Sequence, residues 1–526
     1  MKFTKRILSV GLVGAMLVTA GCSSKGEVNE SKGENSAQAQ SIVFAAGGDA
    51  INFNPLYAND RVSITVMNSM FNPLYVIDDN GEKVFYLADS IEASDDFLTY
   101  TVKLKKNLKW HDGKPLTVDD IIFTMDSILD KNQNSLNTDS FIIDGKPVEI
   151  KKIDDTTIEF VLPEVSSAIE SAIGKIRPIA KHIYEGEKDL SKSEKNSNPI
   201  GNGAYKFKEY KSGELITLEK FDEYYGKKAN LDTVNYRIIA DSNSANVALQ
   251  NGEVNAKYVT PDEVENVKSK DNVDIITYDE GMVDNIIFFQ QRNDNLKKKE
   301  VRQAIAYALN KEELIKASYK SEKYADKAYS LFSPNVMGYS DDVEKYDQNK
   351  EKAKELLKNA GIKDLKLTIA FGTHKSQLET TALVVQSNLK EIGIDVELKP
   401  MEKSAYFAKL NNPSSIDFDL GLNGYVMGNE PNDYAPLFIS ENLSNYGGYE
   451  NKNLDDKFTA ALKETDKAKR DEIYKEIQQT LADDMVLYPI AYSKSIVALD
   501  KKYDGANEAT PAPIYMFRDV NELKLK

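Results

Sequence analysis

Residues 87–129 read LADSIEASDDFLTYTVKLKKNLKWHDGKPLTVDDIIFTMDSIL. In its first half, apolar residues alternate with polar ones, which is the period of a half-buried strand; they are Leu98, Tyr100, Val102 and Leu104. Asp112-Gly113 predicts a turn, because glycine accepts a positive φ and aspartate tolerates it. Thr117 with Asp120 three residues later resembles a capping box. Apolar residues then recur at helical spacing, at Ile121, Ile122, Met125, Ile128 and Leu129. The stretch predicts a strand, a turn bearing Trp110, and a helix.

The exact residue sequence of this stretch is more informative than its polar and apolar periodicity. LTYTVKLKKNLKWHDGKPLTVDDIIFT, residues 98–124, resembles the signature region of the family 5 bacterial extracellular solute-binding proteins over more than twenty positions. These proteins are the oligopeptide, dipeptide and nickel receptors of ABC importers. Other stretches continue the resemblance; they are residues 53–57, 70–75, 199–207 and 301–309. The resemblance implies a solute receptor that delivers its ligand to permease subunits.

Composition is that of a soluble globular protein, with 41% hydrophobic and 29% charged residues. A chain of 526 residues exceeds one hydrophobic core and predicts two or three subdomains. The net charge of −16, without a basic stripe, argues against nucleic acid as a partner. We expect a monomer.

The N-terminus has the features of an export signal. Residues 1–21 combine a basic start, a short apolar run and small residues, and the run is too short to span a membrane. Ala20-Gly21-Cys22 resembles a lipobox, in which the cysteine is acylated, although Thr19 replaces the usual leucine. Residues 22–40 are polar and predict a flexible tether. We therefore expect an extracytoplasmic protein that contacts the cell membrane through lipid on Cys22 only.

The expected fold class is α/β. Residues 365–371, 378–392 and 394–398 read strand, helix, strand, which implies a parallel pair. The resemblance implies the periplasmic-binding-protein-like (type II, family 5) fold, with two lobes, an extra subdomain and a hinged ligand cleft. We expect lobe I at 41–78, 199–290 and 493–526, the extra subdomain at 79–198 and lobe II at 291–492. The hinge is expected near 285–292 and 490–495.

No catalytic motif is present, and no enzyme activity, cofactor or metal site is expected. The G-x-S-x-G, P-loop and H-E-x-x-H patterns are all absent. Histidine occurs only at His111, His182 and His374, without local ligand spacing, and His111 is expected at the surface of the turn. Gly201-x-Gly203 lacks the third glycine and the following helix of a phosphate loop. We interpret these glycines as backbone relief at a tight crossing.

The resemblance places the ligand site after the strand near Phe418. In the family this strand edge offers backbone groups to an extended peptide, and an aromatic residue lines a side-chain pocket. The expected ligand-binding residues of this lobe are Gly424, Tyr425, Val426, Met427, Asn429, Glu430 and Asp433. The opposite wall is expected at Asn59, Asp60 and Arg61. Arg61 either binds a ligand carboxylate bidentately or pairs with an acid at the surface.

One departure from the family bears on the ligand. Peptide receptors of the family that bind the ligand's amino group have an aspartate four residues before the proline of an Asp/Glu-Pro pair. In this chain that proline is Pro431, and the position of the aspartate is occupied by Met427. Either the peptide N-terminus stays solvated, or Glu430 or Asp433 takes over. The alternatives to an oligopeptide receptor are a nickel or metal-chelate receptor of the same fold, and a sensor or adhesin without a transport partner. No histidine falls in this region to favour nickel.

Overall fold

The computed structural model describes residues 40–78 and 80–526. Within them, one sheet of eleven strands passes through both halves of the molecule. Ten strands follow one another in the order β10 (Tyr205–Lys211), β11 (Leu215–Lys220), β12 (Thr233–Ile238), β1 (Ser41–Ala46), β13 (Ala256–Tyr258), β19 (Leu487–Asp500), β14 (Val273–Phe288), β18 (Leu420–Val426), β16 (Leu365–Gly372) and β17 (Ile394–Met401). The eleventh, β15 (Ala325–Lys327), pairs with β19.

A second sheet contains the strand predicted at residues 98–104. Its order is β4 (Ala88–Ala93), β5 (Thr99–Leu104), β9 (Thr157–Val161) and β8 (Glu149–Lys152). Helix α2 (Val118–Leu129) begins at the predicted capping box, in which Asp120 Oδ2 accepts from Thr117 N–H at 3.0 Å. Gly113 has a φ of +83°, and Trp110 is fully buried. The predicted strand, turn and helix are confirmed.

The remaining elements of the N-terminal half surround these sheets. The helices are α1 (Arg61–Met70), α3 (Ile169–Gly174), α4 (Lys181–Tyr184), α5 (Ser242–Gln250) and α6 (Val264–Lys268), with short helices η1 (Thr138–Phe141), η2 (Leu190–Lys192) and η3 (Glu194–Ser197). The small strand pairs are β2 (Tyr75–Ile77) with β3 (Lys83–Phe85) and β6 (Ile142–Ile143) with β7 (Lys146–Pro147). The C-terminal segment adds β20 (Tyr503–Asp504) with β23 (Lys524–Leu525), β21 (Pro511–Ala512) with β22 (Met516–Phe517), and η6 (Val520–Glu522).

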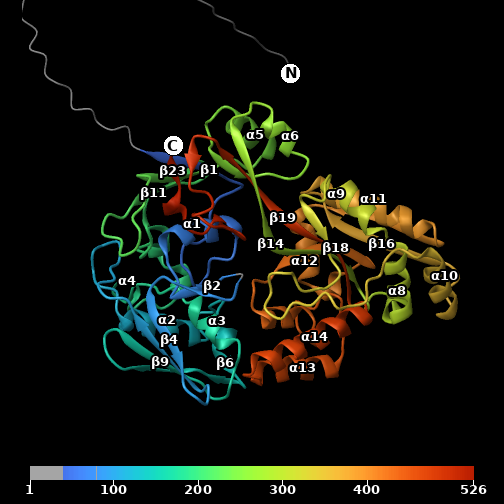
Figure 1. The fold of residues 1–526 in the computed structure, drawn as a ribbon, viewed down its shortest axis with the longest axis horizontal. Coiled ribbons are helices and arrows are strands. Elements are labelled where there is room, and N and C mark those ends of the chain that lie inside the picture. The colour runs from blue at the N-terminus through green and yellow to red at the C-terminus, as the bar shows by residue number, and fades with distance from the viewer. Residues whose placement is uncertain (1–39, 79) are drawn as a thin grey trace, which may run out of the picture. The chain divides into compact units, whose positions relative to one another are not determined.

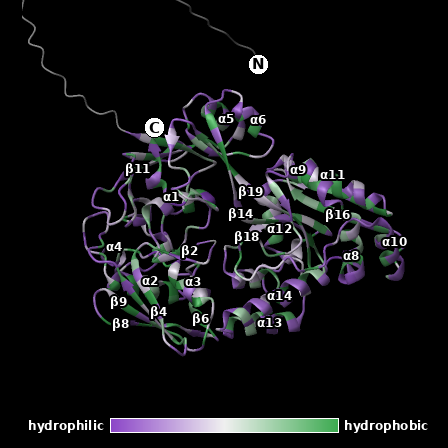
Figure 2. Cartoon of the chain, in the orientation of Figure 1, coloured by the Kyte–Doolittle hydropathy of each residue, from purple (hydrophilic) through white to green (hydrophobic). Residues whose placement is uncertain are grey.

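The C-terminal half is an α/β layer with a helical addition. Its helices are α7 (Asp294–Lys297), α8 (Lys299–Ala308), α9 (Lys311–Tyr319), α10 (Lys350–Asn359), α11 (Ser376–Lys390), α12 (Lys403–Leu410), α13 (Lys452–Lys463) and α14 (Lys467–Asp483), with η4 (Pro413–Ser415) and η5 (Pro431–Leu437). Strands β16 and β17 are parallel and joined through α11, as predicted. In Figure 2 many strand residues are apolar, and many residues of the helices and loops are polar.

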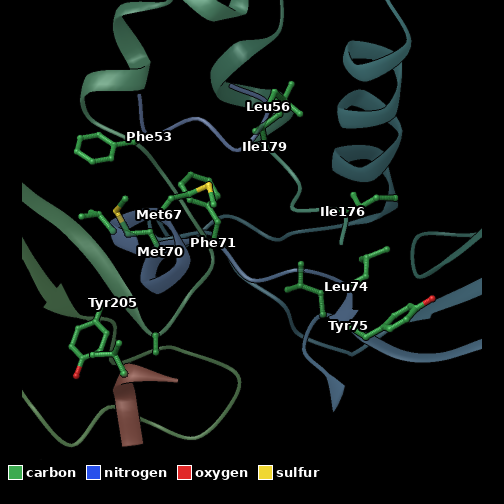
Figure 3. Close-up of a cluster of buried hydrophobic side chains, with 14 of the residues drawn as sticks. Phe53, Leu56, Met67, Met70, Phe71, Leu74, Tyr75, Ile176, Ile179 and Tyr205 are labelled. Atoms are coloured by element: carbon green, nitrogen blue, oxygen red, sulfur yellow. The ribbon is translucent and has the colours of Figure 1, made fainter. Parts of the chain in front are cut away.

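Separate hydrophobic cores define two lobes. The first core joins β1, β12, α1 and the second sheet; Figure 3 shows part of it, with Met67, Met70 and Phe71 grouped at the end of α1 and Leu74 near Ile176. The second core joins α8 to α11 with β16, β17 and β18. We call these bodies the first and second lobes, and we count the separate core of η5, α13 and α14 with the second lobe. The first-lobe core is continuous with that of residues 88–190.

Strands β14 and β19 connect the lobes (Figure 1). Ile276 packs against the first core, whereas Ile286 of the same strand lies in the second. Their antiparallel pairing shifts register between Asp279 and Met282, where Gly281 has a φ of +72°. A register shift bends a strand locally. This irregularity lies opposite Ser493, inside the expected 490–495 range, and begins before the expected 285–292 range.

The histidine of the turn corrects one expectation. His111 is buried rather than at the surface. Its Nδ1 accepts from Gly201 N–H, and its Nε2–H donates to the Gly203 carbonyl, both at 3.1 Å. Burial lowers the pKa of His111 to about 4, so the ring is neutral at pH 7. The histidine therefore joins the turn to the glycine-rich loop, an arrangement that depends on a segment ninety residues away.

The structure confirms that Gly201 and Gly203 are needed for a close approach between two backbone segments. Asn202 N–H and Gly203 N–H both donate to the Met70 carbonyl, at 2.9 and 2.7 Å. A Cβ on Gly201 would collide with that carbonyl oxygen, and one on Gly203 with the carbonyl oxygen of Ser69. The absence of side chains lets the loop cross the end of α1.

Candidate ligand-binding cleft

Three adjoining cavities lie beside residues 137–177 of the first lobe, and two of them also touch residues 426–463 of the second. The largest is about 670 Å³ and is lined by Val426 and Met427 together with η5 and α13. The second is about 280 Å³, between α3 and the end of α13. The third is about 200 Å³, between α1 and α3. Ser140 lines all three, so the cavities adjoin at this residue, and we refer to them together as the cleft.

The end of β18 forms part of the cleft wall. One edge of β18 pairs with β14 along its whole length, but the other pairs with β16 only at Leu420 and Gly421. Tyr406 Oη–H donates to the Leu422 carbonyl at 2.9 Å. Residues 423–426 therefore have no strand partner on that second edge among the described residues. This edge ends at Val426, which lines the largest of the three cavities.

Three of the predicted second-lobe residues line the cleft, namely Val426, Met427 and Asp433. Asp433 lines two cavities, and its carboxylate pairs with Lys175 of the first lobe at 2.9 Å. Met427 contributes an apolar surface to the largest cavity. Of the two acids expected to replace the missing aspartate, Asp433 is the one that the structure places on the cleft.

Glu430 and Tyr425 do not line these cavities. Glu430 is 5% exposed and caps η5, where its Oε1 accepts from Asn432 N–H at 3.3 Å. Burial raises its pKa to about 7. Tyr425 donates its hydroxyl to the Leu331 carbonyl at 2.6 Å and packs edge-on against Tyr434. Its aromatic ring therefore belongs to the second-lobe interior rather than to a ligand pocket between the lobes.

Asn429 and Gly424 have structural contacts of their own. Asn429 Nδ2–H donates to the carbonyl of Ile77 at 2.8 Å, so this side chain reaches from the second lobe to β2. Gly424 pairs with Asp284 of β14, and a Cβ there would approach the Asp284 carboxylate. Asn429 bridges the lobes beside the cleft, and Gly424 lets β18 lie close to β14.

The residues predicted for the opposite wall, Asn59, Asp60 and Arg61, lie at the N-terminal end of α1. Asp60 is its N-cap, with Oδ1 accepting from Ser63 N–H at 2.9 Å. Asn59 and Arg61 are exposed, and the Arg61 guanidinium lies 4.8 Å from the Tyr258 ring centroid. None of the three lines the three cavities. Pro55, Leu56 and Ala58, from the same segment, line the 200 Å³ cavity instead.

The first-lobe wall was missed in the sequence because its residues follow the short helix α3. Lys175 is the C-cap of α3, and Arg177 follows two residues later. The Arg177 guanidinium donates to the Phe71 carbonyl and, at 3.0 Å, to Asn68 Oδ1. Neither position bears a local motif. Only the packing of α3 against β2 and η1 brings them to the cleft.

The lobes also touch at the rim of the cleft. Ser167 N–H donates to the Leu462 carbonyl at 2.7 Å, and its hydroxyl donates to the Ala461 carbonyl at 3.1 Å. Lys463 pairs with Glu164 at 2.7 Å. The first-lobe serine thus caps the end of α13, whose last carbonyls have no partner within the helix. These contacts join the two lobes at this rim.

Residues 40–78 and 80–526 contain neither a candidate metal site nor a candidate membrane-spanning helix. No group of three or more His, Cys, Asp or Glu side chains in this part of the chain has metal-binding geometry. No helix in the same residues is long and apolar enough to cross a membrane. Cys22 lies outside the described residues.

Comparison with known proteins decides the family. The profile named "Bacterial extracellular solute-binding proteins, family 5 Middle" matches residues 84–448. The chain belongs to this family. A family 5 protein is a non-catalytic substrate-binding protein of an ABC transporter. The fold class and the absence of enzyme activity expected from the sequence are thereby confirmed.

Relatives and solved structures agree with this assignment. The oligopeptide-binding protein AppA of Bacillus subtilis is 31% identical, over 95% of each chain. The dipeptide-binding protein of Escherichia coli is 29% identical, over 89% of this chain and 92% of that protein. The crystal structure of the ABC transporter substrate-binding protein CtaP of Listeria monocytogenes has a TM-score of 0.90 and 45% identity, covering 93% of this chain and 99% of that one.

Proposed function

We propose that this family 5 protein captures extracellular oligopeptides in the cleft between its lobes and delivers them to the permease. The observation that carries the proposal is the unpaired edge of residues 423–426, which ends at the largest cavity. An extended peptide can add to such an edge through main-chain hydrogen bonds, which are independent of the peptide's side chains. Each bond contributes only about 0.5–1.5 kcal/mol net, so several must form together.

The relatives support a peptide ligand. AppA of Bacillus subtilis, whose structure was solved with a nonapeptide, has a TM-score of 0.79 and 29% identity to this chain, covering 93% of it and all of AppA. The family also includes glutathione-binding proteins, such as one of Pectobacterium atrosepticum at 27% identity, over 92% of this chain and 94% of that protein. The metal-chelate alternative has no histidine on the cleft walls to favour it.

The proposal includes where the protein works. A lipid anchor on Cys22 would hold it at the outer face of the cell membrane, with residues 23–40 as a tether. Two or three acyl chains anchor far more firmly than one, since each buried methylene contributes about 0.8 kcal/mol. Family 5 proteins act outside the cytoplasm, in keeping with this location.

Calorimetry separates the ligand classes. We expect alanine peptides of three to nine residues ending in leucine to bind, and a nickel–histidine chelate not to bind. Binding should also draw the lobes together, so small-angle scattering should show a smaller radius of gyration with peptide than without it. Binding of the chelate but of no peptide would refute the proposal.

A further inference from the structure

A buried lysine lies in the first lobe, away from the cleft. Lys257 of β13 is 4% exposed, and lysine is almost never fully buried unless it is paired. Its Nζ meets Asn246 of α5 and Glu263, which directly precedes α6. Helices α5 and α6 lie side by side (Figure 1). None of the three residues lines the cleft cavities, so ligand binding does not explain them.

The side-chain amide of Asn246 lies between the lysine and the glutamate. Asn246 is 1% exposed. Lys257 Nζ donates to Asn246 Oδ1, and Asn246 Nδ2–H donates to Glu263 Oε1 at 3.0 Å. A C=O bond is only ~1.23 Å long, so the carbon Cγ lies directly behind the oxygen that Nζ contacts. An amine nitrogen and an amide carbon are therefore held together, which removes much of the entropic cost of a reaction between them.

Glu263 contacts both of these partners. Its Oε2 lies 3.6 Å from Lys257 Nζ, and its side chain is 14% exposed. Oε2 also accepts from Thr260 N–H at 2.9 Å, and Oε1 accepts from the Ser242 hydroxyl. Burial raises the pKa of Glu263, but these hydrogen bonds and the nearby lysine hold that pKa below its usual value. Glu263 is therefore a carboxylate that can take a proton from the lysine.

The neighbouring core is apolar. It joins α5, α6 and β19, and its residues include Leu249, Val264, Val267 and Ile496. Lys257 lies opposite Ala498 in the β13–β19 ladder, so its side chain is on the same face of the sheet as this core. Burial lowers the pKa of Lys257, although Glu263 opposes this change. The uncharged amine is the nucleophilic form of lysine, and desolvation favours it.

We propose that Lys257 and Asn246 form an intramolecular isopeptide bond, with Glu263 as the proton carrier. Glu263 takes a proton from the Lys257 ammonium, and the neutral Nζ attacks Asn246 Cγ. The Nζ–Cγ bond forms and the Cγ–Nδ2 bond breaks. Glu263 passes its proton to the departing nitrogen, which leaves as ammonia, and then holds the second proton that Nζ releases. An amine and a carboxamide give a secondary amide and ammonia, so no oxidant, cofactor or other reactant is consumed.

The bond ties α5 covalently to β13. Strand β13 pairs with β1 and β19, so α5 becomes attached to the middle of the large sheet. Cys22 is the only cysteine in the chain, and no intrachain disulfide can supply such a link. The cross-link is independent of the ligand that the cleft binds.

Tryptic peptide mapping of the purified protein tests the bond directly. Trypsin does not cleave after a lysine whose amine is part of an amide. We expect one peptide, residues 238–268, lighter than its sequence requires by one ammonia molecule, whereas unlinked protein gives residues 238–257 and 258–268. Both signs are required, because succinimide formation at Asn251-Gly252 also releases ammonia but leaves Lys257 cleavable. Complete cleavage after Lys257 in the wild type would overturn the inference.

Variants distinguish the cross-link from a simple ion pair. Asn246→Ala and Glu263→Gln should each restore cleavage after Lys257 and the full mass of both peptides. The matched controls are Asn243→Ala and Glu265→Gln, at exposed positions of the same two helices, and both should keep the linked peptide. Linkage that survives Asn246→Ala would overturn the inference. Linkage to the wild-type extent in Glu263→Gln would overturn the role of the glutamate.

Discussion

Glu430 is predicted to destabilise the protein at high pH. Its pKa is raised by burial from 4.5 to about 7. A carboxyl group whose pKa is higher in the folded state stabilises the fold while it is protonated. This contribution is complete below about pH 4.5 and is lost as pH rises through about 7. At about 1.36 kcal/mol per pKa unit, the loss totals about 3 kcal/mol.

The Glu430→Gln variant tests this value. Glutamine keeps an oxygen that can accept from Asn432 N–H but cannot ionise. Relative to the wild type, we expect its free energy of unfolding to increase by about 2.5 kcal/mol between about pH 5 and about pH 8, measured by urea denaturation at both values. Because Glu430 does not line the cleft cavities, peptide affinity should stay within a few-fold.

The exposed Glu450 provides the matched control. Glu450→Gln should follow the wild type within about 0.5 kcal/mol at both pH values. A Glu430→Gln variant whose difference from wild type is the same at both pH values would refute the buried, protonated carboxyl. A large loss of peptide affinity in this variant would indicate that Glu430 contacts the ligand.

Three further predictions address packing, closure and anchoring. Gly203→Ala should destabilise the protein by about 1–3 kcal/mol in thermal or chemical unfolding, because its Cβ would collide with backbone, whereas Gly47→Ala, which has open space, should be near neutral. Asn429→Ala should weaken peptide binding by two- to tenfold, as expected for one lost hydrogen bond of about 0.5–1.5 kcal/mol to Ile77 across the lobes, measured by calorimetry. Cys22→Ser should move the protein from the membrane to the soluble fraction of cells.

Each of these has an outcome that contradicts it. Equal stability of the two glycine variants would mean that the loop crossing tolerates a side chain. Unchanged peptide affinity in the asparagine variant would mean that its bond to β2 does not contribute to closure. Membrane retention of the serine variant would show that lipid on Cys22 is not the anchor.

The fold could be predicted because its signals are local. The capping box of Thr117 and Asp120 fixes where α2 begins whatever packs on it. The strand–helix–strand pattern around α11 likewise requires only its own periodicity. The resemblance of motifs such as residues 98–124 to the family then predicted the two-lobe arrangement, which periodicity alone does not determine.

The cleft was predicted only in part because its walls are brought together by tertiary packing. Met427 and Asp433 follow a recognisable strand, and both line the cleft. Lys175 and Arg177 lie after a six-residue helix, where a basic residue is ordinarily a solvated surface group. The same limit applied to His111, whose burial depends on a glycine-rich loop distant in sequence.

The central claim is that the cleft holds oligopeptides, and native mass spectrometry of the protein purified from the cells that produce it tests this most directly. A closed cleft retains its ligand during gentle purification. We predict a set of bound masses that fragment into peptides of several residues with varied sequences, because the recognition is through the peptide backbone. A single non-peptide solute, such as a metal chelate, bound at full occupancy would contradict the account.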